Sequence, residues 1–194
     1  MALHLTMGNC DRRVLFAKTL KKLRPTAPPV DGRLVGVLEA ERANFFFLDS
    51  LHDTERTITK GSLGDAQVKW LARALDANAD KPALVVAHHH INRESGKSDT
   101  WRQGGLIDGS KLVDVLRPRS HVKAFIFGHT HNWHHGMLDG IHLINLPTTA
   151  YIFDPAEPRG WVDGRLERDG VRMKLRALNG KHPKHGETLK LRWR

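Results

Sequence analysis

The chain has 194 residues, 40% of them hydrophobic and 27% charged, which is enough apolar material for one folded domain and excludes disorder throughout. A single cysteine excludes an internal disulfide, and no apolar run approaches the roughly 20 residues of a membrane-spanning helix. The formal net charge of +10 is unevenly placed, because residues 12–24 carry six basic side chains and no acid, and residues 165–194 carry ten against three acids.

The first two thirds of the sequence predict strands that alternate with helices. A glycine-containing turn at residues 8–11 follows the first expected strand, and Asp11 is placed to cap the first helix. Asp65 is expected to cap the second helix. Strands are predicted over 3–7, 35–38, 44–48, 83–87 and 122–127, and helices over 12–23, 66–77 and 109–116.

The last third of the sequence changes to hairpins. Asp139-Gly140 separates apolar runs at 133–138 and 141–146, and Asp169-Gly170 separates runs at 161–166 and 171–178. We therefore predict an α/β (α+β) fold, a layered sandwich of mixed β-sheets flanked by helices. Residues 1–150 are expected to form the main domain, with residues 151–194 as a terminal β-hairpin and basic tail packed on it.

Polar residues with metal-binding chemistry follow three of the predicted strands, where ligands of open α/β sheets usually bind. Imidazole combined with amide or carboxylate oxygen favours Zn, Mn or Fe over Ca or Mg. A histidine at a strand end is by itself usually a surface or hydrogen-bonded residue, but three such turns in one domain favour a metal site. The residues are Asn9, Cys10, Asp11, His88, His89, His90, His129 and His131.

These residues resemble the motifs of the calcineurin-like metallophosphoesterases, in the branch that includes cyclic-nucleotide phosphodiesterases. Residues 8–11 are similar to the family's Gly-Asn-His-Asp/Glu motif, residues 83–89 to its apolar strand that ends in a ligand histidine, and residues 128–131 to its Gly-His-Thr/Val-His motif. The likeness covers most of residues 3–150. It implies a hydrolase of phosphate esters, most simply a phosphodiesterase, with two divalent ions (Mn, Fe or Zn) that activate a hydroxide.

The resemblance also implies roles for individual residues. One ion would be held by Asn9, His88 and His129, and the other by His131. Cys10 and Asp11 stand at the catalytic positions of the family's turn. Cys10 replaces the family's histidine, which helps to protonate the leaving group. Since a thiol is a weaker hydrogen-bond donor than an imidazole, we expect weaker or altered activity.

The family's earlier Asp-x-His and Gly-Asp-x-x-Asp motifs do not occur in this sequence, which begins seven residues before the Gly-Asn turn. These motifs supply the carboxylates of the two-ion site. Asp11 and Asp49 are conceivable substitutes, although no pattern places them as ligands. We therefore expect a chain that lacks the first βαβ segment of its family, with an exposed sheet edge that a second copy or an N-terminal partner would cover.

Two other functions remain open at this point. The first is a truncated, catalytically impaired fragment that binds a metal or phosphate. The second is a basic nucleic-acid-binding domain. No zinc-finger, recognition-helix or stacking-aromatic pattern accompanies the basic residues in the sequence, so nucleic acid is not the partner that we expect. A small phosphoester is the expected substrate, with residues 92–105 and 151–161 at the rim of its pocket. A signal-peptide pattern is absent from the first residues, and we expect a cytoplasmic protein with no membrane partner.

Overall fold

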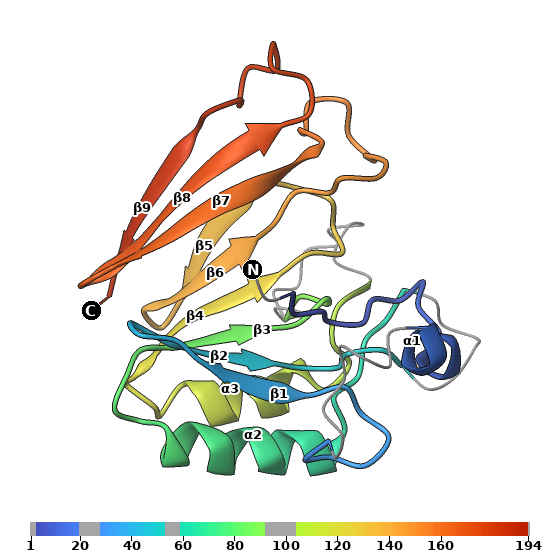
Figure 1. Ribbon diagram of the computed structural model, residues 1–194, viewed down its shortest axis with the longest axis vertical. Coiled ribbons are helices and arrows are strands. Elements are labelled where there is room, and N and C mark those ends of the chain that lie inside the picture. Colours follow the sequence, from blue (N-terminus) through green and yellow to red (C-terminus); the bar gives the residue numbers. More distant parts are fainter. Residues whose placement is uncertain (1–2, 20–27, 53–58, 92–103, 194) are drawn as a thin grey trace.

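A six-stranded mixed sheet forms the centre of the molecule in the computed structural model, which describes residues 3–19, 28–52, 59–91 and 104–193. Its strand order is β1-β2-β3-β4-β6-β5, and a second sheet has the order β7-β8-β9 (Figure 1). The elements are α1 (Arg13–Thr19), β1 (Gly36–Glu39), β2 (Asn44–Phe47), α2 (Asp65–Ala77), β3 (Ala83–Val86), α3 (Gly109–Leu116), β4 (Val122–Phe127), β5 (His134–Leu138), β6 (Ile141–Asn145), β7 (Gly160–Glu167), β8 (Gly170–Ala177) and β9 (Thr188–Arg192).

The middle of the large sheet is parallel. Strand β3 lies between β2 and β4, and β4 also pairs with β6 in the same direction. The apolar runs of β3 and β4 are buried almost throughout, as expected for parallel strands that are covered on both faces. The two outer strands, β1 and β5, are antiparallel to their neighbours. The carboxyl ends of β3 and β4 consequently lie side by side.

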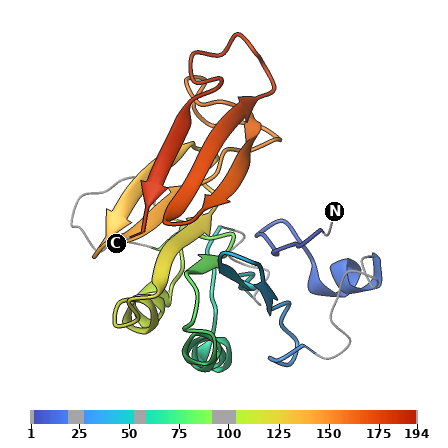
Figure 2. The same cartoon turned by 60° about the vertical axis from the view of Figure 1, so that its left-hand side comes forward.

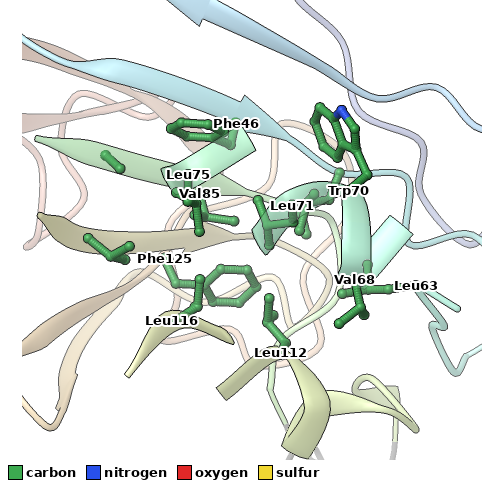
Figure 3. Packing of buried hydrophobic residues seen from close by; sticks show 14 of the residues in the cluster. Phe46, Leu63, Val68, Trp70, Leu71, Leu75, Val85, Leu112, Leu116 and Phe125 are labelled. Carbon is green, nitrogen blue, oxygen red and sulfur yellow. The ribbon is translucent and has the colours of Figure 1, made fainter. Parts of the chain in front are cut away.

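The helices α2 and α3 cover one face of this sheet (Figure 2). Leu71 and Leu75 of α2 and Leu112 of α3 are fully buried against the sheet residues Phe46 and Phe125, as Figure 3 shows. A fully buried leucine or phenylalanine contributes about 1.5–3 kcal/mol to folding, so this cluster stabilises the α-to-β layer contact.

The sheet β7-β8-β9 packs over the other face, along β4 and β6 (Figures 1 and 2). Leu84, Ala124 and Ile144 of the large sheet form one buried cluster with Met173 and Leu175 of β8. The molecule is thus layered as helices, large sheet and small sheet. This arrangement confirms the predicted layered sandwich of mixed sheets flanked by helices.

Three local predictions are wrong. Residues 3–7 form no strand, because Leu3 is exposed and Met7 is buried in a small separate cluster with Leu34 and Leu51. Asp65 does not cap α2, which begins after Gly64 without a side-chain cap. The small sheet has a third strand, β9, in the part of the chain that was expected to be a tail.

The start of α2 is held from α3 instead. The Asp108 carboxylate accepts hydrogen bonds from the backbone N–H groups of Leu63 and Gly64 at 3.0 and 2.8 Å, while Asp65 pairs with Lys111. The first helix, predicted over 12–23, is observed from Arg13 to Thr19, and residues 20–27 lie outside the described part of the chain. In the described ranges, no helix is long and apolar enough to cross a membrane.

Candidate metal centre

Two histidines meet at the carboxyl ends of the neighbouring strands β3 and β4. The parallel pairing continues past the strands, since Ala87 donates its N–H to Ile126 at 3.0 Å and Gly128 donates to the His88 carbonyl at 3.0 Å. His88 and His129 each come two residues after the end of a strand. Their ring nitrogens, His88 Nε2 and His129 Nδ1, lie 3.1 Å apart.

The side-chain oxygen of Asn9 completes a triangle with these two nitrogens. Asn9 Oδ1 lies 2.8 Å from His88 Nε2 and 3.2 Å from His129 Nδ1. An amide oxygen only accepts hydrogen bonds, and an Nε2–H group points at one acceptor at a time. The mutual approach of all three atoms therefore fits a common partner between them better than hydrogen bonds alone.

Close backbone packing fixes the orientation of both rings. His129 has a left-handed backbone with φ of 67°, and a hydrogen bond with the Thr59 backbone holds its other side. A side chain at Gly104 would place its Cβ 2.2 Å from His129 Nε2, and one at Gly8 would come within 3.0 Å of the His88 ring. Glycine is required at Gly104 so that the histidine can keep its position.

His89 is a third imidazole close to this point, and the sequence did not single it out from its neighbours. It is fully buried, its Nδ1 lies 2.8 Å from the Ser50 hydroxyl, and its Nε2 has no hydrogen-bond partner among the described residues. Within the described chain, His88, His89 and His129 are the histidine, cysteine or acidic side chains whose ligand atoms all lie within 4.8 Å of one another. The signal in the sequence that could have indicated His89 is its position directly after His88.

Burial keeps these imidazoles neutral. It lowers the pKa of His88 to about 3 and that of His129 to about 4, with further lowering by neighbouring histidines. Burial also lowers the pKa of His89, to about 2. A neutral imidazole has a free lone pair, which is the form that a metal ion requires.

His131, Cys10 and Asp11 lie outside the triangle. His131 Nδ1 is buried without a hydrogen-bond partner in the described structure, and its ring contacts Tyr151 and Phe153. Cys10 is exposed, and its sulfur lies 3.6 Å from Asn9 Nδ2. Asp11 is also exposed and closes its turn by accepting a hydrogen bond from the Gly8 N–H at 2.7 Å. The catalytic roles of Cys10 and Asp11 and the ligand role of His131 stay predictions.

Asp49 is engaged elsewhere. Its fully buried carboxylate pairs with Arg13, with Nε–Oδ2 and Nη2–Oδ1 distances of 2.9 and 3.1 Å. It also accepts hydrogen bonds from the backbone N–H groups of Leu34 and Leu51, both at 3.1 Å. These contacts give Asp49 a structural role, because they tie the start of α1 to the segment that follows β2.

A family model described as calcineurin-like phosphoesterase matches residues 1–133. The chain belongs to this family. Two phosphodiesterase-named relatives are similar to it in sequence. The 3',5'-cyclic adenosine monophosphate phosphodiesterase CpdA of Haemophilus influenzae is 29% identical over 132 residues, which cover 62% of this chain and 47% of the relative. A probable cyclic nucleotide phosphodiesterase of Psychrobacter arcticus is 27% identical over 157 residues, 78% of this chain and 52% of the relative.

Solved structures show the same fold. A dimetal phosphatase from Danio rerio matches 98% of this chain and 72% of its own length, with a TM-score of 0.75 and 16% identity. The structure of PhoD matches 92% of this chain and 45% of its own length, with a TM-score of 0.63 and 11% identity. The chain therefore has the fold of the calcineurin-like phosphoesterases, and it spans about half the length of the two phosphodiesterase-named relatives.

The triangle fits the divalent metals of a calcineurin-like phosphoesterase. Ligands bound at about 2.1 Å and at right angles to one another lie about 3.0 Å apart. The three observed separations are 2.8, 3.1 and 3.2 Å. Two neutral imidazoles and an amide oxygen are also donors that Mn, Fe and Zn accept. The residues present therefore fit one such ion.

Proposed function

We propose that this chain is the phosphate-binding and metal-binding part of a phosphodiesterase that acts on cyclic nucleotides. The observation that carries the proposal is the convergence of Asn9 Oδ1, His88 Nε2 and His129 Nδ1 within 3.2 Å of one another. The family match and the phosphodiesterase-named relatives support the reaction class.

In this proposal Asn9, His88 and His129 hold one divalent ion. When bound, the ion supplies Lewis-acid polarisation of the phosphoryl oxygens and lowers the pKa of water. His88 and His129 do not exchange protons near neutral pH, because burial lowers the pKa of both, to about 3 and about 4. They act as fixed ligands and not as general acids.

His131 is the candidate ligand for a second ion. Its Nδ1 is the buried nitrogen without a partner, while a hydrogen bond with the Tyr151 backbone engages the ring from the other side. A backbone partner on one ring nitrogen fixes the tautomer that leaves the other free for a metal. One matched ligand holds an ion weakly, so the second ion depends on donors beyond those described.

Cys10 is the candidate proton donor to the leaving oxygen. It is exposed and directly follows Asn9, with its sulfur 3.6 Å from the amide nitrogen of that residue. The Cys10→His variant restores the residue that the family resemblance places there. We expect Cys10→His to raise turnover, and unchanged turnover in a metal-loaded, active protein would remove this role.

Metal content and hydrolysis together test the function. The chain is supplemented with Mn²⁺, the bound metal is counted by elemental analysis, and hydrolysis of 3',5'-cyclic AMP is followed by chromatography. We expect at least one tightly bound ion and measurable turnover, both lost in His129→Ala. His185→Ala serves as the matched control, because His185 is an exposed histidine in the connection between β8 and β9.

The outcomes separate the parts of the proposal. Two ions per chain would support the dinuclear site, and one ion would limit the proposal to the Asn9, His88 and His129 position. Turnover that survives His129→Ala, or an absence of bound metal in the unsubstituted chain, would overturn it.

A further inference from the structure

Two large aromatic side chains stand exposed beside the candidate metal centre. Tyr151 and Phe153 are 58% and 68% exposed, and both lie in the β6–β7 loop, residues 146–159. Aromatic side chains are usually buried in the core. Two neighbouring exposed rings therefore indicate a surface that binds a ligand or a partner.

Both rings contact His131. Phe153 stacks on the His131 imidazole with ring centres 4.7 Å apart and planes 16° apart. Tyr151 meets the same imidazole edge-on at 4.6 Å and Phe153 edge-on at 5.2 Å. Stacking covers one face of the Phe153 ring, and its large exposed fraction leaves the opposite face open to a ligand.

The loop that carries these rings is anchored. Ile152, between them in the chain, lines a cavity of about 190 Å³ together with Ala177 of β8 and other residues of the loop and the small sheet. Glu157 accepts hydrogen bonds from the Trp133 N–H at 3.0 Å and from Lys184 Nζ at 2.6 Å. Ile152 lines this cavity, while the rings of its two chain neighbours contact His131.

His131 connects the two aromatic rings to the candidate metal centre. It is two residues from His129 in the turn that follows β4, and its ring contacts Tyr151 at 4.6 Å and Phe153 at 4.7 Å. The two rings therefore stand at the strand end that carries His129.

We propose that Tyr151 and Phe153 form an aromatic wall that binds a flat ring, a nucleobase, on the substrate whose phosphate lies at the metal centre. This inference rests on the proposed function. It adds the part of the substrate, the base, by which the protein prefers one phosphodiester over another. The wall gives a preference for phosphodiesters that carry a base over those that do not. Stacking does not read hydrogen-bond patterns, so the wall discriminates little among different bases.

The experiment compares two substrates that differ only by the base. These are 3',5'-cyclic AMP and methyl β-D-ribofuranoside 3,5-cyclic phosphate, both assayed with the Mn²⁺-supplemented chain. We expect kcat/KM to favour cyclic AMP by about tenfold, as one stacked base typically gives. Phe153→Ala and Phe153→Leu should both bring this ratio close to one, mainly through KM, because leucine keeps apolar volume but loses the flat ring.

A matched control removes an exposed apolar side chain from elsewhere. Met137 is 42% exposed on β5, where it pairs in register with His142 of β6. Met137→Ala should leave the substrate ratio as it is in the unsubstituted chain. Thermal unfolding of each variant, followed by circular dichroism, identifies any variant that fails to fold, and Tyr151→Ala then provides the second test of the wall.

A binding measurement separates this inference from the proposed function. Binding of adenosine 5'-monophosphate and of ribose 5-phosphate is measured by calorimetry in the presence of Mn²⁺. We expect the adenosine compound to bind about tenfold more tightly, and Phe153→Ala to remove the difference. Equal binding of the two compounds to the unsubstituted chain would overturn the wall, whether or not the chain hydrolyses any phosphodiester. A difference in binding without hydrolysis would support the wall and refute the proposed function.

Discussion

The buried imidazole of His88 couples the stability of the metal-free chain to pH. Burial, with a smaller contribution from His129, His131 and His90, lowers its pKa from 6.5 to about 3. In the unfolded chain the imidazole binds a proton as the pH falls below about 6.5. Between these two values the unfolded state binds more protons than the folded state, so stability rises with pH across this interval.

The size of the effect follows from the interval. The stabilisation is fully present above about pH 6.5 and is lost progressively as the pH falls toward the folded pKa. A pH of 5 lies about 1.5 units below the pKa of the unfolded imidazole. Each of these units lowers the free energy of unfolding by about 1.4 kcal/mol. His88 should therefore account for about 2 kcal/mol of stability lost between pH 8 and pH 5.

Urea unfolding in the presence of EDTA measures this loss. We expect His88→Gln to lose about 2 kcal/mol less than the unsubstituted chain between pH 8 and pH 5, whatever its stability at pH 8. His185→Gln controls for the removal of an imidazole from an exposed position. Parallel stability curves for His88→Gln and the unsubstituted chain would refute the reasoning, because they would mean that His88 binds its proton equally in both states.

Two further predictions concern residues that support the centre. Arg13→Met removes the guanidinium that pairs with the buried Asp49 carboxylate, and we expect a loss of about 3 kcal/mol in the free energy of unfolding, measured by urea denaturation at pH 7. A loss below 1 kcal/mol would contradict this role. Gly104→Ala forces a Cβ against His129 Nε2, and we expect Mn²⁺ affinity, measured by calorimetry, to fall at least tenfold. Gly36→Ala is its control, because a Cβ at that position meets no atom within 4 Å, and an equal effect of both substitutions would count against the orienting role of Gly104.

The layered fold could be predicted because the buried strands have an unambiguous pattern. The runs that form β3 and β4 are continuous and apolar, and the observed bounds of β4 and α3 agree with the predicted ones. The alternation at residues 3–7 was misleading, because a strand needs a neighbour for its backbone as well as an alternating pattern. Met7 is instead buried by packing of side chains in a separate cluster.

The site was predictable where the ligand atoms follow strands and less so elsewhere. Asn9, His88 and His129 were selected from motifs, and the structure brings all three together. His89 was not distinguished, because only the buried contact with Ser50 shows which way its ring points. Residues 151–161 were expected at a pocket rim, which stays a prediction, and residues 92–103 of the other expected rim lie outside the described chain.

The three converging atoms belong to residues that are far apart in the sequence, and these separations predict an order of assembly during folding. His88 and His129 are 41 residues apart on hydrogen-bonded neighbouring strands, while Asn9 is 79 residues from the nearer of the two. We expect the β3–β4 pairing to place the two rings first, because closing the longer loop costs about 0.6 kcal/mol more for a doubling of length. An ion captured by two imidazoles would then recruit the N-terminal segment through Asn9. We expect Mn²⁺ to slow amide hydrogen exchange most strongly in residues 7–13, which makes this segment a reporter of metal occupancy.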